Sequence, residues 1–93
     1  MKKNTNQSKE KLLTFPCRFP MKVIGIRQDG LAEEVVGIIQ NYDPTFSASN
    51  VDMKISHKGN YLSLTVLVNA TSQEMLDNVY RALTSHRNIK FVL

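Results

Sequence analysis

The sequence predicts an α+β domain in which two helices cover one face of a four-stranded antiparallel sheet. Strand-like alternation occurs in four segments and helical spacing in two: residues 21–27, 51–57, 61–70 and 89–93 for strands, and 31–42 and 71–84 for helices. The order is strand, helix, strand, strand, helix, strand, which is the split βαβ, or ferredoxin-like, pattern (βαββαβ). Right-handed crossovers then place both helices on one face, with the strands in the order fourth, first, third, second.

The chain length and the charge distribution indicate one domain. With 93 residues, 42% of them hydrophobic, the chain is long enough for one core and too short for two. The formal net charge of +4 is concentrated in a polar N-terminal stretch with lysines at positions 2, 3, 9 and 11, so the remainder is close to neutral. We therefore expect residues 1–9 to form a mobile polar and basic arm and residues 10–93 to form a single domain.

Hydropathy and cysteine content bound the class of protein. No run approaches the roughly 18 apolar residues of a membrane helix, and no apolar signal segment follows the N-terminal stretch. We therefore expect a cytoplasmic protein with no membrane partner. A single cysteine, Cys17, excludes an internal disulfide framework, and no Cys or His spacing suits a zinc site. Cys17 is interpreted as a small apolar filler beside Phe15 and Phe19, with a reactive thiol as the alternative.

The first strand is expected at residues 21–27. It follows a stretch bracketed by Pro16 and Pro20, which must be extended or turned rather than helical. Its helix-covered face is assigned to Met21, Val23 and Gly25. A glycine there lets a helix approach the sheet closely, and a β-bulge is the alternative interpretation.

The first helix is capped by Asp29 or Gly30 and ends before Asp43, because the ring of Pro44 disfavours helical geometry at that residue. Acidic residues in its first turn suit the helix dipole. Phe46 is the expected anchor of the following loop. The buried stripe is expected to comprise Leu31, Val35, Ile38, Ile39 and Tyr42.

The second and third strands are expected to form a hairpin in which residues whose numbers sum to 117 face each other. Met53 and Ile55 then meet Leu64 and Leu62 on the helix-covered face. A slip of one residue would mix the two faces and is disfavoured. The hairpin tip comprises Ser56, Lys58, Gly59, Asn60 and Tyr61.

The second helix begins with the spacing of a capping box, from Thr71 to Glu74. Asp77 and Arg81 lie four residues apart and are expected to pair. Residues 85–88 end the helix, and residues 89–93 alternate as the last strand. The expected buried stripe of the helix is Met75, Leu76, Val79, Tyr80 and Leu83.

The predicted topology leaves one sheet face without helices. Four apolar residues are expected on this face: Ile24, Ile26, Leu67 and Val92. This is more apolar surface than scattered surface residues explain, so we expect a protein partner, self-association or a ligand there. The alternative is that the N-terminal segment around Leu12, Leu13 and Phe15 folds back over part of this face. The residues assigned to the face are Lys22, Ile24, Ile26, Lys54, Ser63, Thr65, Leu67, Lys90 and Val92.

Several short motifs in order resemble the small bacterial YbeD-like family. They are Phe15-Pro16, Lys22-Val23-x-Gly25, Ser56-x-Lys58-Gly59-Asn60-Tyr61-x-Ser63, Leu76-Asp77-x-x-Tyr80-Arg81-x-Leu83-Thr84 and Val92-Leu93. The resemblance covers nearly all of the chain beyond residue 12. It implies a stand-alone ferredoxin-like domain similar to the ACT-type regulatory domains that bind amino acids in metabolic enzymes, and it implies no known activity.

The chain offers no set of residues that predicts catalysis. His57 and His86 lie at opposite ends of the predicted elements, without a base, nucleophile or metal partner. The carboxylates of Glu33 and Glu34 belong to a helix's first turn, and the glycines are isolated, so no phosphate-cradling loop is present. We therefore expect no enzyme, no catalytic residue, no metal and no cofactor.

Three functional hypotheses remain. The favoured one is an ACT-like regulatory or protein-interaction module. Residues 27–31 match the glycine-bearing ligand loop of ACT domains only loosely, so binding of a small metabolite is left open within this hypothesis. The second is RNA binding, because the RRM shares this topology. Ser63, Thr65 and Leu67 replace the stacking aromatic residues of an RRM, however, so nucleic acid is not favoured. The features that support it are Tyr61 and the lysines Lys22, Lys54, Lys58 and Lys90.

The third hypothesis is a small acylphosphatase-like enzyme. Such chemistry needs an arginine-bearing phosphate loop after the first strand. Arg18 and Arg27 imitate that loop only weakly. This hypothesis therefore ranks below the other two.

Overall fold

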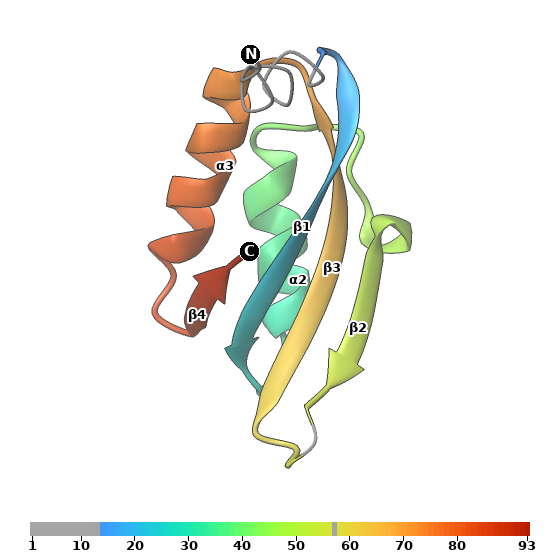
Figure 1. Cartoon of the computed structure of the whole chain (residues 1–93). Coiled ribbons are helices and arrows are strands. Elements are labelled where there is room, and N and C mark those ends of the chain that lie inside the picture. The colour runs from blue at the N-terminus through green and yellow to red at the C-terminus, as the bar shows by residue number, and fades with distance from the viewer. Residues whose placement is uncertain (1–13, 57) are drawn as a thin grey trace, which may run out of the picture.

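The computed structural model describes residues 14–56 and 58–93 and contains one antiparallel sheet with strand order β2-β3-β1-β4. The two helices lie together on one side of this sheet (Figure 1). The predicted ferredoxin-like fold and its strand order are therefore confirmed. The elements are β1 (Cys17–Ile26), α2 (Leu31–Gln40), the short 3₁₀ helix η1 (Ala48–Asn50), β2 (Val51–Ile55), β3 (Tyr61–Ala70), α3 (Gln73–Thr84) and β4 (Ile89–Val92). The predicted N-terminal arm and His57 lie outside the described residues.

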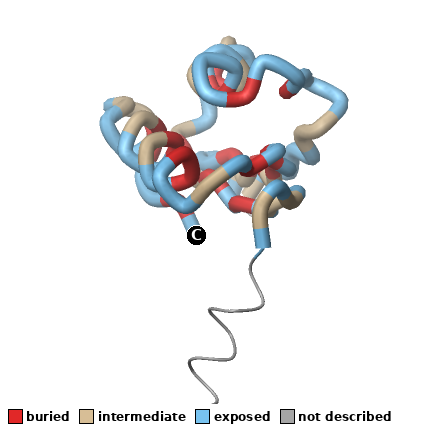
Figure 2. The backbone as a smooth tube through the Cα atoms, turned by 90° about the horizontal axis from the view of Figure 1, so that it is seen from above, coloured by how far each residue is buried: buried red, intermediate tan, exposed pale blue. Residues whose placement is uncertain are grey.

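A single apolar core fills the space between the sheet and the helices. Figure 2 marks its buried positions in red along both layers. Phe46 is buried as expected and anchors the loop after α2, whereas Cys17, Phe15 and Phe19 pack on the core while partly buried. The fully buried large side chains are Leu31, Ile39, Leu64, Leu83, Val23, Val35, Val66, Val68 and Val79.

The first strand begins four residues earlier than predicted, at Cys17, and continues through Pro20. Pro20 is tolerated within the strand because its nitrogen faces a side where no neighbouring strand of the described chain needs an N–H donor. The backbone N–H of Lys22 donates to the carbonyl of Leu93 on the β4 side (3.0 Å). Pro20 lies two residues before Lys22, so its nitrogen faces the same side, beyond the end of β4, where no ladder bond is lost.

The hairpin register is as predicted. Val51 pairs with Val66 and Ile55 with Leu62, so that the residue numbers sum to 117 along the whole ladder. The N–H of Ser56 donates to the carbonyl of Tyr61 (2.9 Å) and continues this register toward the tip. Gly59 has φ 78°, a left-handed conformation that glycine adopts without steric cost.

The last strand departs from the predicted alternation. Val23 pairs with Val92 and Ile24 with Phe91, but Gly25 pairs with Ile89, so the register shifts at this point. This β-bulge reverses the face of every residue beyond it. Ile89 and Val92 are both buried, whereas Lys90 and Phe91 are exposed. The expectation that Val92 lies on the open face is therefore wrong, and Phe91 takes that place.

The helix α2 matches its prediction except near its end. Gly30, with φ 86°, is the N-cap residue, and Glu33 and Glu34 occupy the first turn. Leu31, Val35 and Ile39 are buried and Ile38 is partly buried. Tyr42 is exposed, contrary to expectation, because the helix stops at Gln40 and the helical spacing no longer applies beyond it.

The helix α3 differs from its prediction at three points. Its N-cap is Ser72, whose hydroxyl accepts from the N–H of Met75 (3.0 Å), so the predicted capping box at Thr71 is wrong by one residue. Tyr80 is 48% exposed because it lies at the flank of the buried stripe. The expected pairing of Asp77 with Arg81 is replaced by hydrogen bonds within the helix: Gln73 donates to Asp77 (3.0 Å) and Arg81 to Asn78 (3.1 Å).

Candidate functional site

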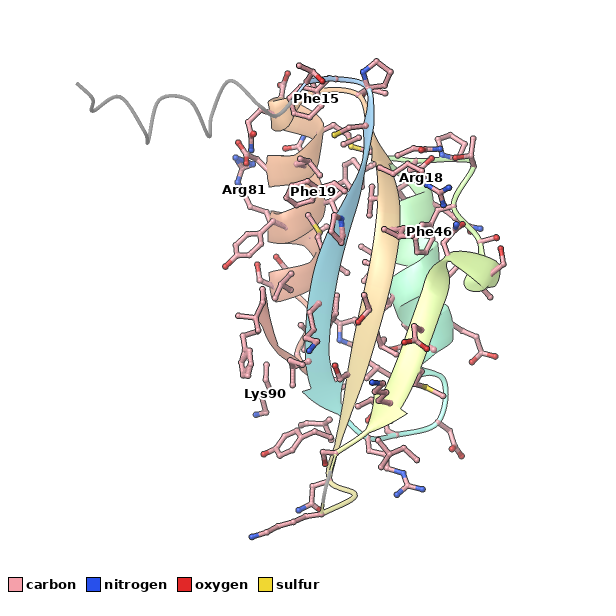
Figure 3. The ribbon with its side chains drawn as sticks, turned by 45° about the vertical axis from the view of Figure 1, so that its right-hand side comes forward. Phe15, Arg18, Phe19, Phe46, Arg81 and Lys90 are labelled. Atoms are coloured by element: carbon pink, nitrogen blue, oxygen red, sulfur yellow. The ribbon has the colours of Figure 1, made fainter. Side chains whose placement is uncertain are left out.

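The sheet face opposite the helices carries eight of the nine residues that the sequence assigned to it. Val92 is the exception and is buried to 7% exposure. Phe15 packs against the core beside α3 (Figure 3), so it does not cover the open face, whereas Leu12 and Leu13 of the same segment lie outside the described residues. The residues on or bordering this face are Lys22, Ile24, Ile26, Lys54, Ser63, Thr65, Leu67 and Lys90. Their role in an interaction remains a prediction.

Two aromatic side chains stand on this face around a central isoleucine. Ile24 pairs with Phe91 on one neighbouring strand, and the next residue on the same face, Ile26, pairs with Tyr61 on the other. Tyr61 is 42% exposed and Phe91 is 49% exposed. Together with Ile24 and Lys90 they line one shallow hollow. The alternation rule missed Phe91, and the glycine at position 25, a possible bulge marker, was the signal that pointed to it.

The hairpin tip is connected to the end of β1 by one backbone and one side-chain hydrogen bond from Arg27. The N–H of Arg27 donates to the carbonyl of Asn60 (3.0 Å), and its guanidinium donates to the carbonyl of Gly59 (3.3 Å). The N–H of Gly59 donates to Ser56 (2.9 Å), and Lys58 is exposed. The tip is therefore a supported turn that presents Tyr61 to the open face.

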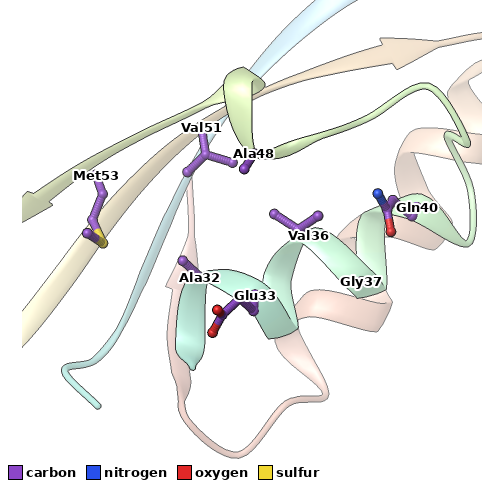
Figure 4. A pocket seen from close by; sticks show the side chains of 8 residues that line it. All are labelled: Ala32, Glu33, Val36, Gly37, Gln40, Ala48, Val51 and Met53. Atoms are coloured by element: carbon purple, nitrogen blue, oxygen red, sulfur yellow. The ribbon is translucent and has the colours of Figure 1, made fainter. Parts of the chain in front are cut away.

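A groove runs between α2 and β2 on the helix side of the sheet (Figure 4). One end of the groove is apolar, with Glu33 and Gln40 at its rim. The other end continues along Met53 and Ile55 to the loop of residues 27–30. The groove exists because α2 packs near η1 and leaves this part of β2 uncovered. The apolar end is lined by Ala32, Val36, Gly37, Ala48, Val51 and Met53.

Two large side chains of β2 are exposed although they point to the helix side. Met53 is 52% exposed and Ile55 is 54% exposed. Their cross-strand partners Leu64 and Leu62 are buried, as the register predicts. The predicted register placed Met53 and Ile55 on the correct side, but the sequence did not predict that α2 and α3 leave them uncovered. Because β2 is an outer strand of the sheet, this apolar surface adjoins a strand edge with which no other described strand pairs.

Two polar groups that could suggest chemistry have structural partners instead. Asp43 is buried, and its carboxylate accepts from Thr45 and from the N–H of Asn69 (2.9 Å), which joins the loop after α2 to β3. His86, for which no partner was expected, contacts Glu34 (2.8 Å) and accepts from the N–H of Asn88. Both groups connect elements of the fold, and neither opens into the hollow or the groove.

The comparisons with known proteins identify the family. A family model described as "Protein of unknown function (DUF493)" matches residues 10–93. The chain belongs to the DUF493 family. A UPF0250 protein of Ralstonia nicotianae is 49% identical over 91% of this chain and 88% of its own length. A UPF0250 protein of a Janthinobacterium species is 45% identical over 90% of this chain and 92% of its own length. The resemblance to YbeD-like proteins is thereby confirmed.

A solved structure also matches this DUF493 chain. The solution structure of protein HP0495 from H. pylori superimposes with a TM-score of 0.72 at 15% identity, over 87% of this chain and 85% of that chain. At this identity the similarity establishes the fold alone. The described part of the chain has no helix long and apolar enough to cross a membrane. It also has no group of His, Cys, Asp and Glu side chains placed to hold a metal ion.

Proposed function

We propose that this DUF493 protein is a non-enzymatic regulatory module, similar to ACT-type domains, that pairs with a second copy along β2. One observation carries the proposal: the edge strand leaves Met53 and Ile55 more than half exposed. Large apolar side chains beside an unpaired strand edge favour association, because burial removes apolar area from water and the partner strand satisfies the free backbone groups.

The backbone of β2 favours one pairing with a second copy. Ser56 directs its N–H to β3, so by alternation Val51, Met53 and Ile55 direct theirs to the free edge. Two such strands pair antiparallel with Met53 opposite Met53 of the second copy. Val51 then lies opposite Ile55, and the exposed apolar side chains meet on the helix side.

Charge selects the same register. With Met53 at the symmetry axis, Asp52 lies opposite Lys54 of the second copy, and the two-fold axis repeats this pair. A shift of two residues in either direction would instead place Asp52 opposite Asp52 or Lys54 opposite Lys54, and like charges directly opposite are destabilising. The strand therefore carries complementary charge and complementary apolar surface in one register only.

A charge exchange in β2 tests the pairing. Asp52→Lys and Lys54→Asp each turn two attractive pairs into two repulsive ones, so each should weaken self-association by about tenfold. The double variant Asp52→Lys with Lys54→Asp restores opposite charges across the axis and should restore association. Sedimentation equilibrium over a range of protein concentrations measures all four proteins. In the chain's own sheet both residues face neutral Thr65 and Ser63, so the fold should tolerate the exchange.

Two controls complete this test. Met53→Glu removes apolar contact at the axis and should give a monomer, whereas Leu67→Lys, on the open face, should leave self-association unchanged. A wild-type protein that stays monomeric at its highest soluble concentration would contradict the pairing. Equal weakening in the single and double charge variants would contradict the register.

A second candidate function is binding of a small amphipathic molecule in the groove between α2 and β2. The apolar walls and the carboxylate of Glu33 at the rim suit a ligand with an aliphatic part and an ammonium group. ACT-type domains, which the chain resembles, bind amino acids. A ligand that binds the folded state raises its denaturation temperature by mass action. A panel of amino acids should therefore contain a stabiliser whose effect is lost in Ala32→Leu, which fills the groove, and retained in Tyr80→Ala.

A further inference from the structure

We propose that the open sheet face binds single-stranded nucleic acid, with Tyr61 and Phe91 as stacking platforms. The two rings stand on strands that flank β1 and border one hollow with Ile24 and Lys90. Each is about half exposed, so a ring face is available to a base. Aromatic rings presented on a sheet of this topology bind the faces of unpaired bases.

The charges on this face are those that a polyanion requires. Arg18, Lys22, Lys54 and Lys90 are all exposed. Arg18 and Lys90 lie toward opposite ends of the sheet (Figure 3), so the basic groups extend along its length. Asp52, which pairs with Thr65 and lies on this same face, is the only acidic residue in the four described strands. The basic groups therefore offer contacts to a phosphate backbone that passes the two rings.

Four acidic residues lie on the opposite side of the molecule. Glu33 and Glu34 lie on α2, and Glu74 and Asp77 lie on α3, both helices on the far side of the sheet. The same helices carry one basic residue, Arg81, so basic residues predominate on the strands and acidic residues on the helices. This separation favours a polyanion over a neutral protein surface as the occupant of the open face.

The open face also indicates what kind of recognition to expect. Ser63 and Thr65 are partly buried neutral residues between the basic side chains. Stacking on a ring tolerates every base, because each base has a π face. We therefore expect binding with little sequence preference. The proposal does not depend on pairing through β2, although two copies joined at that edge would present their basic faces on the same side of one sheet.

Fluorescence anisotropy with labelled oligo-dT and oligo-rU tests this inference on the full chain. The wild type should bind at least one of the two, and the ratio of their affinities distinguishes DNA from RNA. Affinity should fall by about tenfold or more between about 50 and 200 mM salt, as counterion release requires. Phe91→Ala and Tyr61→Ala should each weaken binding by about fivefold or more. Phe91→Tyr keeps an aromatic ring and should therefore bind the oligonucleotide as the wild type does.

The controls separate stacking from simple charge. Tyr80→Ala removes an equally exposed ring from α3 and should leave binding unchanged. The aromatic variants leave every lysine in place, including those in the N-terminal stretch, so a loss of binding reports on the rings. Leu67→Lys should not weaken binding of the oligonucleotides. The same substitution would weaken binding of a protein partner that uses this face. Absence of binding to both oligonucleotides at low salt, or equal affinity of the wild type, Phe91→Ala and Tyr61→Ala, would overturn the proposal.

Discussion

Phe91 on β4 lies directly opposite Ile24 on β1, on the face of the sheet that neither α2 nor α3 covers. One residue later along the chain, Val92 lies opposite Val23 in the core. The shift between Ile24 and Gly25 determines which of the two neighbours is buried. A bulge at one position therefore sets the character of both sheet faces.

This arrangement predicts unequal effects of truncating the two neighbours. Val92→Ala removes buried methyl groups and should lower the free energy of unfolding by about 1–3 kcal/mol. Phe91→Ala removes a side chain that is half in solvent and should cost less. Urea denaturation followed by circular dichroism compares the two. A larger loss for Phe91→Ala would place that ring in the core and contradict the observed bulge.

The center of the core should be sensitive on both of its layers. Leu64 on β3 and Val79 on α3 are fully buried, and each alanine substitution should destabilise the fold by about 1–4 kcal/mol through the cavity that remains. Arg87→Ala, at an exposed position, is the control and should stay within about 0.5 kcal/mol of the wild type. Denaturant unfolding measures all three. If both core variants lost less than about 0.5 kcal/mol of stability, the assignment of buried and exposed faces would be contradicted.

Two glycines make a matched pair for helix and sheet packing. A Cβ atom on Gly25 would lie 2.8 Å from Leu31 Cδ2 and 2.9 Å from the carbonyl oxygen of Asn88, so Gly25→Ala should destabilise by about 1–3 kcal/mol. A Cβ atom on Gly37 meets nothing within 4 Å. Gly37→Ala, in the interior of a helix, should stabilise by about 0.5–1 kcal/mol. Thermal unfolding should therefore move in opposite directions for the two variants, and a shared direction would refute the explanation.

The start of α3 can be located by a pair of neighbouring hydroxyl groups. Ser72→Ala removes the oxygen that accepts from the N–H of Met75 and should cost about 1 kcal/mol. Thr71→Ala, one residue earlier, should change the stability by no more than a few tenths of a kcal/mol. Equilibrium unfolding in urea measures both. A larger loss of stability for Thr71→Ala than for Ser72→Ala would instead support the predicted capping box of Thr71 and Glu74.

The hairpin register and the topology were predictable because alternation and helical spacing are local properties of the chain. Two adjacent hydroxyl groups at the start of α3 satisfy the same capping rule, so pattern alone placed the cap one residue too early. The bulge depends on a tertiary fit, in which the carbonyl of Asn88 accepts from the N–H of Ile26 (2.8 Å) while Leu31 packs close to Gly25. No local pattern contains that fit.

The sequence predicted which side of the sheet is open, but only some of the residues on it. Ile24 and Leu67 lie where the alternation placed them. The alternation also gave the correct side for Met53, but exposure depends on whether a helix reaches the strand, and the sequence does not specify how far α2 extends over the sheet. The apolar groove beside β2 was missed for this reason.

The two edges of the sheet differ in their ability to recruit another strand. β4 is short and carries the bulge at Lys90, and beyond its end Pro20 presents no N–H, so that border resists pairing. β2 has neither a proline nor a bulge. A sheet with two receptive borders can polymerise without limit, whereas one with a single receptive border is used up once two copies have joined. The pairing proposed along β2 therefore closes at two copies and leaves no receptive border for growth into fibres.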